Sequence, residues 1–222
     1  RHPTRDHQEM NSKHAFLGAL LAISGTAHAD NLLVNGSFES PSIAGYNYIF
    51  YPSGSNAITG WTATGAGETQ NTRTEFLPAA DGFQWVDLTG NIGYDKGLIS
   101  DAVATEIGST YRLSFFLGDY APFGSSTVSV KFNNGPATLF TNVYQSGTMD
   151  WEQKSFDWIA DATSVRISFT GVANGALSNN LGIGLDGVGL EKVAVAVPEP
   201  ETYALMLAGL GLVGAMARRR WA

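Results

Sequence analysis

The chain has 222 residues, a formal net charge of −7 and no cysteine, which excludes disulfides and thiolate chemistry. All four histidines lie within the first 28 residues, so residues 30–197 also lack the imidazole that Ser-His-Asp catalysis and the usual zinc sites need. That stretch carries sixteen acidic and seven basic residues. Because such a surface repels phosphates, nucleic acid is not an expected partner.

The N-terminal residues have the pattern of a removable export signal. Residues 1–9 precede Met10, and we treat them as an upstream extension outside the fold. A short basic region, an apolar run and an A-x-A site that ends at Ala29 then follow in the order of a signal peptide over 10–29. We therefore predict cleavage after Ala29 and a mature chain that begins at Asp30. The alternative is a buried N-terminal helix.

Residues 30–192 alternate apolar and polar residues at the period of β-strands. The alternation is clearest over 111–117, 128–132, 165–169 and 183–190. Turn signals such as Asp81-Gly82 and Asn174-Gly175 lie between the alternating runs. Because no helical period interrupts this pattern, we predict an all-β fold, a jelly-roll β-sandwich that fills residues 30–192.

A further alternating segment, residues 83–88, contains a tryptophan with polar neighbours. Strict alternation sets Val86 and Leu88 on one face and Trp85 with Asp87 on the other. If the apolar pair faces the core, Trp85 faces outward or packs beneath a loop. We predict that the Trp85 ring stacks on a sugar, with Asp87 and Gln84 as polar partners.

Other aromatic residues are candidates for the same role. Tyr120 and Phe123 lie in a loop bounded by glycine and proline, where strand alternation does not enforce burial, and Asp119 precedes them as a polar partner. Trp61 is instead predicted to belong to the core. An earlier segment is also crowded with aromatic residues, namely Tyr46, Tyr48, Phe50 and Tyr51. The predicted stacking platform is Trp85, Tyr120 and Phe123.

The acidic residues give no specific sign of catalysis. Glycoside hydrolysis needs two carboxylates at a set separation across a cleft. Sixteen acids make accidental pairs inevitable, and Glu75, Asp87 and Asp119 have no diagnostic spacing. We expect no enzymatic activity.

Residues 193–222 form a linker and a tripartite C-terminal segment. Pro198-Glu199-Pro200 holds the chain extended, an uncharged helix-prone run covers 203–217, and three arginines end at Arg220. This order resembles the PEP-CTERM sorting signal of Gram-negative bacteria. The resemblance implies export, a transient stop in the inner membrane as a short transmembrane helix, and cleavage near Pro198-Glu199-Pro200 by an exosortase-type protease. The run is short for a permanent anchor, which needs about 20 residues, although an ordinary anchor helix is the alternative.

Five motifs in the body of the chain carry a second resemblance. They lie at 31–39, 58–61, 81–88, 108–115 and 184–190. Their order resembles the galactose-binding-like jelly-roll superfamily, above all the DUF642-type domains and the carbohydrate-binding modules of the family 4, 9 and 22 type. The resemblance implies one structural calcium ion held by Glu39 and Asp186. Many relatives carry two adjacent acids where this chain has Asp186-Gly187, and the alternative is that both carboxylates serve turns.

Together these features predict an exported, non-enzymatic protein of the cell surface or extracellular matrix. Its expected partners are the exosortase-type protease, the inner membrane in transit, and an exopolysaccharide or other envelope glycan that it binds or organises. The alternatives are a purely structural or adhesive matrix protein without a sugar pocket, and an enzyme acting on polysaccharide.

Processing at both ends is directly testable. The intact mass of the protein recovered from the cell surface should correspond to a chain that starts at or near Asp30 and lacks residues 203–220. A surface form that keeps the whole C-terminal segment would contradict the sorting interpretation and leave a plain membrane anchor.

Overall fold

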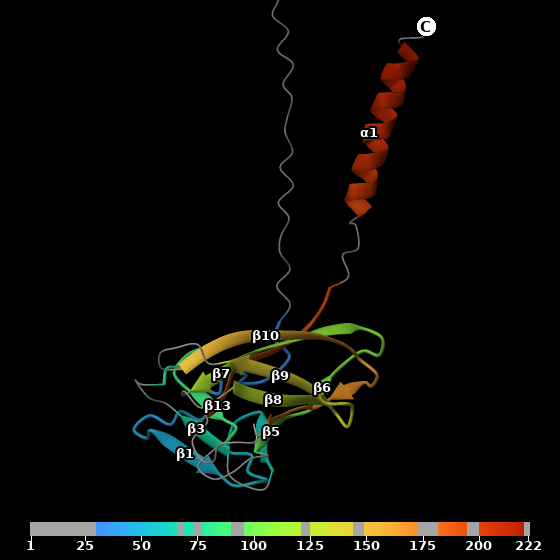
Figure 1. The fold of residues 1–222 in the computed structure, drawn as a ribbon. Helices are drawn as coiled ribbons and strands as arrows, with labels where there is room; N and C mark the ends of the chain where they lie inside the picture. The colour runs from blue at the N-terminus through green and yellow to red at the C-terminus, as the bar shows by residue number, and fades with distance from the viewer. Residues whose placement is uncertain are drawn as a thin grey trace, which may run out of the picture.

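The body of the chain is a sandwich of two antiparallel β-sheets (Figure 1). The computed structural model describes residues 30–65, 69–72, 77–89, 96–120, 125–143, 149–172, 182–194 and 200–219. The predicted signal peptide and the A-x-A site at Ala29 lie outside these residues, as do Pro198 and Glu199 of the sorting signal. The prediction of an all-β sandwich is confirmed.

The first sheet has six strands and the second has five. In spatial order, the first sheet consists of β1 (Tyr48–Tyr51), β3 (Thr69–Thr72), β4 (Trp85–Asp87), β13 (Gly182–Lys192), β7 (Thr110–Tyr120) and β10 (Met149–Ile159). The second consists of β2 (Trp61–Thr64), β5 (Gly97–Ser100), β12 (Ile167–Val172), β8 (Ser125–Phe132) and β9 (Thr138–Val143). A short pair, β6 (Val103–Ala104) with β11 (Ser164–Val165), lies beside them.

The predicted alternation determines which side chains fill the space between the sheets. Leu113, Phe115 and Leu117 of β7 are fully buried, and Phe115 contacts Phe169 of the opposite sheet with ring centroids 5.2 Å apart. Trp61 is also buried, as predicted, and its indole Nε1 donates to the Val34 carbonyl at 3.1 Å. All buried apolar side chains of the described residues lie between positions 33 and 190. The sandwich is therefore a self-contained unit that we expect to fold alone.

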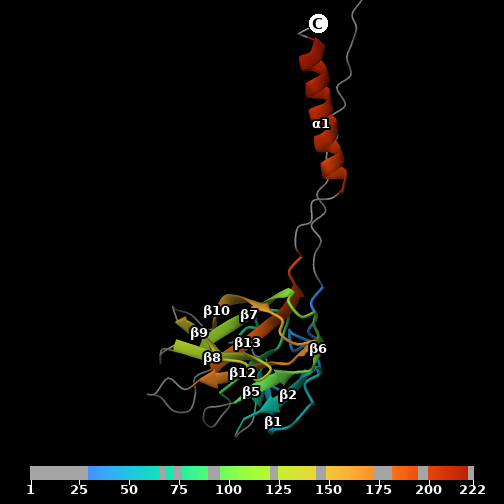
Figure 2. The ribbon, with the colours of Figure 1, turned by 90° about the vertical axis from the view of Figure 1, so that its right-hand side faces the viewer.

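The two ends of the sandwich domain lie side by side (Figures 1 and 2). The backbone N–H of Leu32 donates to the Leu190 carbonyl at 2.8 Å, and Asn31 extends this contact through its side chain. Gly36 continues the same contact, because its carbonyl accepts the N–H of Val188 at 2.9 Å. The entering segment is thereby fixed against β13, the strand that leaves the domain.

Strand ends at the opposite side of the sandwich also gather together. The pairing register brings Tyr120 level with Gly182 and Met149, and Ser125 level with Val143. The connections between these strand ends fall outside the described residues. This end of the domain therefore lies away from the point where the C-terminal segment emerges.

The one helix of the described residues, α1 (Pro200–Arg219), occupies the predicted apolar run and ends with Arg218 and Arg219 in its last turn. Within the ranges that the structure describes, no helix combines the length and apolar character needed to cross a membrane. The helix is therefore present where it was predicted, and its transient stop in the inner membrane stays a prediction.

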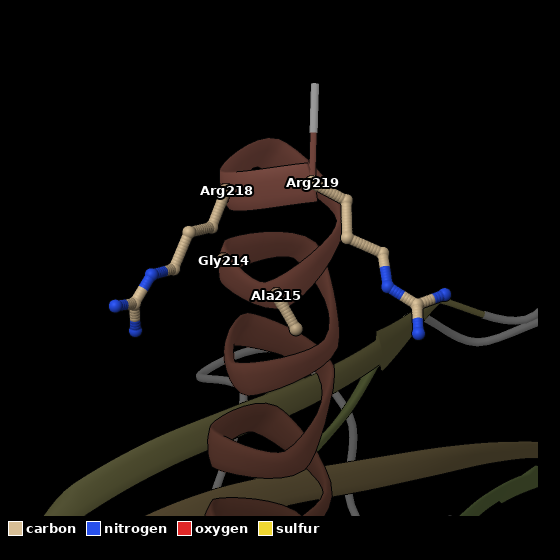
Figure 3. A pocket seen from close by; sticks show the side chains of 4 residues that line it. All are labelled: Gly214, Ala215, Arg218 and Arg219. Carbon is tan, nitrogen blue, oxygen red and sulfur yellow. The ribbon is translucent and has the colours of Figure 1, made fainter. Parts of the chain in front are cut away.

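A surface hollow of about 560 Å³ lies at the C-terminal end of α1. It is lined by Gly214, Ala215, Arg218 and Arg219, and the two arginine side chains point away to either side of the helix (Figure 3). Since all four residues come from neighbouring turns of one helix, we assign this hollow no ligand.

The contact between the entering segment and β13 predicts an intolerant position at Gly36. A β-carbon there would lie 1.8 Å from the Val188 carbonyl oxygen, so Gly36→Ala must displace backbone. We expect it to lower the free energy of unfolding by about 3 kcal/mol or more, within the range of severe backbone clashes. Gly189→Ala, whose β-carbon would lie 3.2 Å from the Ser114 hydroxyl, is the matched control on β13. Equal urea denaturation midpoints for the two variants would contradict this assignment.

Candidate functional site

Trp85 lies on the face of the six-stranded sheet opposite the core, as the alternation predicted, but it is covered. Only 1% of its surface is exposed. Its ring packs edge-on against Trp151, with centroids 5.7 Å apart and an interplanar angle of 82°. The two indole N–H groups donate to successive carbonyls of one covering segment, Trp85 to Leu77 at 3.0 Å and Trp151 to Pro78 at 2.9 Å. The prediction that Trp85 forms a sugar-stacking surface is wrong, because this segment packs over it.

Two glycines make room for the Trp85–Trp151 pair on the outer face of the sheet. Gly118 of β7 and Gly184 of β13 are directly paired in the register, and neither has a side chain to lift the covering ring from the sheet. A β-carbon at Gly118 would lie 2.7 Å from a Trp151 ring carbon, and a β-carbon at Gly184 would lie at the same distance from another. Trp151 therefore lies directly against the backbone of two central strands.

Gln84 and Asp119 are also taken up by the fold. Gln84 is 1% exposed, donates to the Phe38 carbonyl at 2.7 Å and accepts the Ile43 N–H at 2.7 Å, so it joins two neighbouring segments. Asp119 is equally buried and accepts the Ser126 hydroxyl at 2.9 Å. The sequence predicted a loop at Asp119 and Tyr120, but β7 continues to Tyr120. Asp119 therefore points inward, like Leu117. The prediction that Gln84 and Asp119 are polar partners of a ligand is therefore wrong.

The remaining predicted ligand residues are not brought together into a described site. Asp87 is half-buried and accepts both the backbone N–H of Thr89 at 2.8 Å and its hydroxyl. Tyr120 is the last residue of β7, and its side chain lies outside the described part of the structure. Phe123 lies outside the described residues altogether. The roles of Tyr120 and Phe123 stay predictions.

The exposed aromatic side chains of the described sandwich lie elsewhere. Tyr46, Tyr48 and Phe83 are 65%, 46% and 70% exposed, and we call these three residues the aromatic surface. Tyr48 belongs to β1, and its ring meets that of Phe50 edge-on with centroids 4.9 Å apart. The crowded aromatic run at 46–51 was a sequence signal for two of the three. Phe83 follows the Asp81-Gly82 turn, which was the only sequence signal for its exposure.

Hydrogen bonds hold the segments that carry the aromatic surface next to one another. Tyr46 follows a turn in which its N–H donates to the Ile43 carbonyl at 3.0 Å, and Ile43 in turn donates to the side chain of Gln84. The N–H groups of Phe83 and Gln84 both donate to Glu39 Oε1, at 2.6 and 2.8 Å. The exposed ring of Phe83 therefore projects from a backbone that is fixed from two sides.

Asp186 holds the preceding part of the same segment. Its Oδ2 accepts the N–H groups of Ala80 and Asp81, both at 2.8 Å, and its Oδ1 accepts the N–H of Gly187 at 2.7 Å. Burial raises the pKa of Asp186 to about 7 although these three N–H groups oppose the rise, and the nearby charge of Asp81 raises it further. Asp186 thus acts as a buried acceptor that ties residues 80–81 to β13.

These bonds bear on the predicted calcium site. Calcium requires six to eight oxygen ligands, whereas the oxygens of Glu39 and Asp186 face N–H donors, and Asp186 Oδ2 already receives two. Among the described residues, no cluster of three or more His, Cys, Asp or Glu side chains is arranged to hold a metal ion. The two carboxylates as they stand do not fit a calcium ion, so the calcium hypothesis stays a prediction and the alternative of turn chemistry describes their contacts.

A two-sheet sandwich followed by a separate helix that ends in arginines, with a PEP-CTERM protein-sorting motif matching residues 196–220, defines an exported β-sandwich protein with a C-terminal sorting signal. The chain belongs to the DUF642 family: the family model, described as "Protein of unknown function (DUF642)", matches residues 31–181. Both resemblances predicted from the sequence are therefore confirmed. A search of curated proteins found no match.

Solved structures agree on the fold. A cyclase from Fischerella sp. TAU in complex with 4-(1H-indol-3-yl)butan-2-one has a TM-score of 0.55 at 17% identity, covering 76% of this chain and 100% of that chain. Arabinose-bound MgGH51 α-L-arabinofuranosidase has a TM-score of 0.50 at 15% identity, covering 78% and 28%. TmCBM61 in complex with β-1,4-galactotriose has a TM-score of 0.49 at 16% identity, covering 74% and 100%. The cyclase and the arabinofuranosidase share the sandwich fold with this chain, and identities this low say nothing about a shared ligand.

The raised pKa of Asp186 predicts a pH-dependent stability. Between pH 3.8 and about 7 the folded chain holds a proton on Asp186 that the unfolded chain has released. The proton on Asp186 therefore stabilises the folded chain. This stabilisation is fully present below pH 3.8 and is lost as the pH rises through 7, which lowers the free energy of unfolding by about 4 kcal/mol in all.

The measurement is urea denaturation across this pH range for the wild type and for Asp186→Asn, which has no titrating group at this position. We expect the free energy of unfolding of the wild type to fall relative to that of the variant as the pH rises. Parallel curves for both proteins would show that Asp186 does not titrate in this range.

Proposed function

We propose that this protein is an exported, non-enzymatic component of the cell surface or extracellular matrix that binds exopolysaccharide through its aromatic surface. The observation that carries the proposal is the exposure of Tyr46, Tyr48 and Phe83 on segments that hydrogen bonds and strand pairing join to the sandwich. A flat exposed ring can stack on the apolar C–H face of a sugar and remove water from both. Large exposed apolar groups gathered in one region of a soluble domain are typical of interaction sites.

The strength of such contacts can be estimated from area. A ring that covers a few tens of Å² of apolar sugar surface contributes about 1 kcal/mol at about 25 cal/mol per Å². One protein copy therefore binds weakly, and retention in a matrix comes from many copies acting on one polymer. This suits a protein that organises a polysaccharide better than one that captures a free sugar.

Two observations support a non-enzymatic role. A hollow of about 290 Å³ beside the entering segment is lined by residues 32–34, 60 and 101–104, of which Asp101 is the one carboxylate. Glycoside hydrolysis uses two carboxylates across a cleft. Of the acids considered for this chemistry, Asp119 is buried against Ser126, and Asp87 accepts two hydrogen bonds from Thr89. We therefore favour binding over catalysis, with the exosortase-type protease as the partner that processes the PEP-CTERM motif.

The test is affinity electrophoresis of the sandwich domain, residues 30–194, through gels containing neutral or acidic exopolysaccharide. Tyr46→Ala and Phe83→Ala should each weaken retention by about fivefold, since each removes about 1 kcal/mol. Ile107→Ala is the matched control, because Ile107 is an exposed apolar residue, 65% exposed, near the termini. Unchanged mobility of both aromatic variants with an intact fold would favour the purely structural or adhesive role.

A further inference from the structure

Strand β1 forms an open edge of the six-stranded sheet. Its residues pair with β3 on one side, from Tyr48 with Thr72 to Tyr51 with Thr69. On the other side, no backbone hydrogen bond from another described segment reaches residues 48–51. Figure 1 shows β1 at the margin of the domain beside β3. A row of unpaired N–H and C=O groups at such an edge is a template for another strand.

Two of the other three edges of the large sheets are protected, whereas β1 is not. Strand β10 carries the charged residues Glu152, Lys154 and Asp157. The edge of β2 is closed by the segment at 54–55, where Ala63 exchanges two backbone hydrogen bonds of 2.8 Å. Strand β9, Thr-Leu-Phe-Thr-Asn-Val, is an uncharged edge as well, but three of its six residues are polar. The sequence of β1, Tyr-Ile-Phe-Tyr, contains no charge, no proline and no glycine, so nothing in it opposes pairing.

We propose that β1 pairs antiparallel with the β1 strand of a second copy of this chain, joining the two six-stranded sheets into one. If the sheet continues with the same face outward, residues directly opposite one another must share a face. Ile49 then lies opposite its own symmetry mate on the core side. On the outer side, Tyr48 of one copy lies opposite Phe50 of the other, twice about the two-fold axis.

The chemistry of β1 selects a second copy over other occupants. Three of the four residues of the strand meet an apolar or aromatic residue in this register, whereas Tyr51 lies opposite Asn47, and aromatic cross-strand pairs are among the stabilising ones. Tyr48 and Phe50 already contact each other within one copy, so the pairing extends an existing aromatic row. The chain is acidic overall, with a net charge of −7, and two copies repel through their remaining surfaces. The association is therefore reversible and strengthens as salt screens that repulsion.

The experiment is sedimentation of the sandwich domain over a wide range of protein concentration, at low and high salt. The weight-average mass should rise from that of one domain to that of two, at lower concentration in high salt. Tyr48→Lys places a charge on the edge and removes two aromatic pairs at once, and should weaken the association by about tenfold or more. Tyr46→Lys, which alters an exposed tyrosine outside β1, should leave the association unchanged. A wild-type domain that stays monomeric at every concentration overturns the proposal.

A cross-link tests the register and does not depend on the lysine variant being folded. The natural chain has no cysteine, so Ile49→Cys introduces a single thiol at the position that faces itself across the two-fold axis. Opposed strand residues lie within disulfide range. Mild oxidation should convert this variant to a covalent dimer, whereas Tyr46→Cys should remain monomeric. Equal cross-linking of the two variants, or a dimer that persists in folded Tyr48→Lys, would place the interface elsewhere. Glycan retention is tested at Tyr46 and Phe83, outside β1, so either idea can fail without the other.

Discussion

The last strand of the sandwich, β13, is the element on which the rest of the architecture depends. It is bonded to β4 on one side and β7 on the other, and its register shifts between Asp186 and Gly189. Gly187 takes a φ of +54° at this bulge, a conformation that favours glycine. The bulge lies between the Asp186 carboxylate, which holds residues 80–81, and Val188, which receives the entering segment. This one bulge thus positions both the segment that covers the outer face of the sheet and the segment that enters the domain.

A consequence of this arrangement is that two side-chain carboxyl groups organise the covering segment. Glu39 holds residues 83–84 and Asp186 holds residues 80–81, each through backbone N–H groups. Hydrogen bonds from N–H groups to an ionised carboxylate are stronger than those between neutral groups, and the Asp186 carboxyl is ionised above its raised pKa of about 7. The covering segment is anchored at the amides of residues 80, 81, 83 and 84. These bonds explain how a stretch without regular secondary structure keeps Trp85 buried while Phe83 stays exposed.

The sequence was sufficient for the fold and insufficient for the site, for a physical reason. Strand alternation is a local property, so the buried faces of β7 and β8 and the outward face of Trp85 were all predictable from neighbours in the chain. Whether an outward residue meets solvent depends on what lies above it. Trp85 is covered by a segment held through Asp186, about a hundred residues away, and no local pattern reports that contact. The prediction for Asp119 was wrong for a different reason. Gly118 indicated a loop, but the strand continues there, and the glycine makes room for the Trp151 ring.

The position of β13 also determines how the domain responds to force. The C-terminal segment emerges directly from this strand, which lies in the interior of its sheet. A pull along the axis of β13 acts perpendicular to the hydrogen bonds that tie this strand to both neighbours. These bonds are loaded together in shear and cannot be unzipped one after another, as they would be if the exit strand lay at an edge. A force along β13 that is opposed at the far end of the sandwich therefore meets both rows of hydrogen bonds at once.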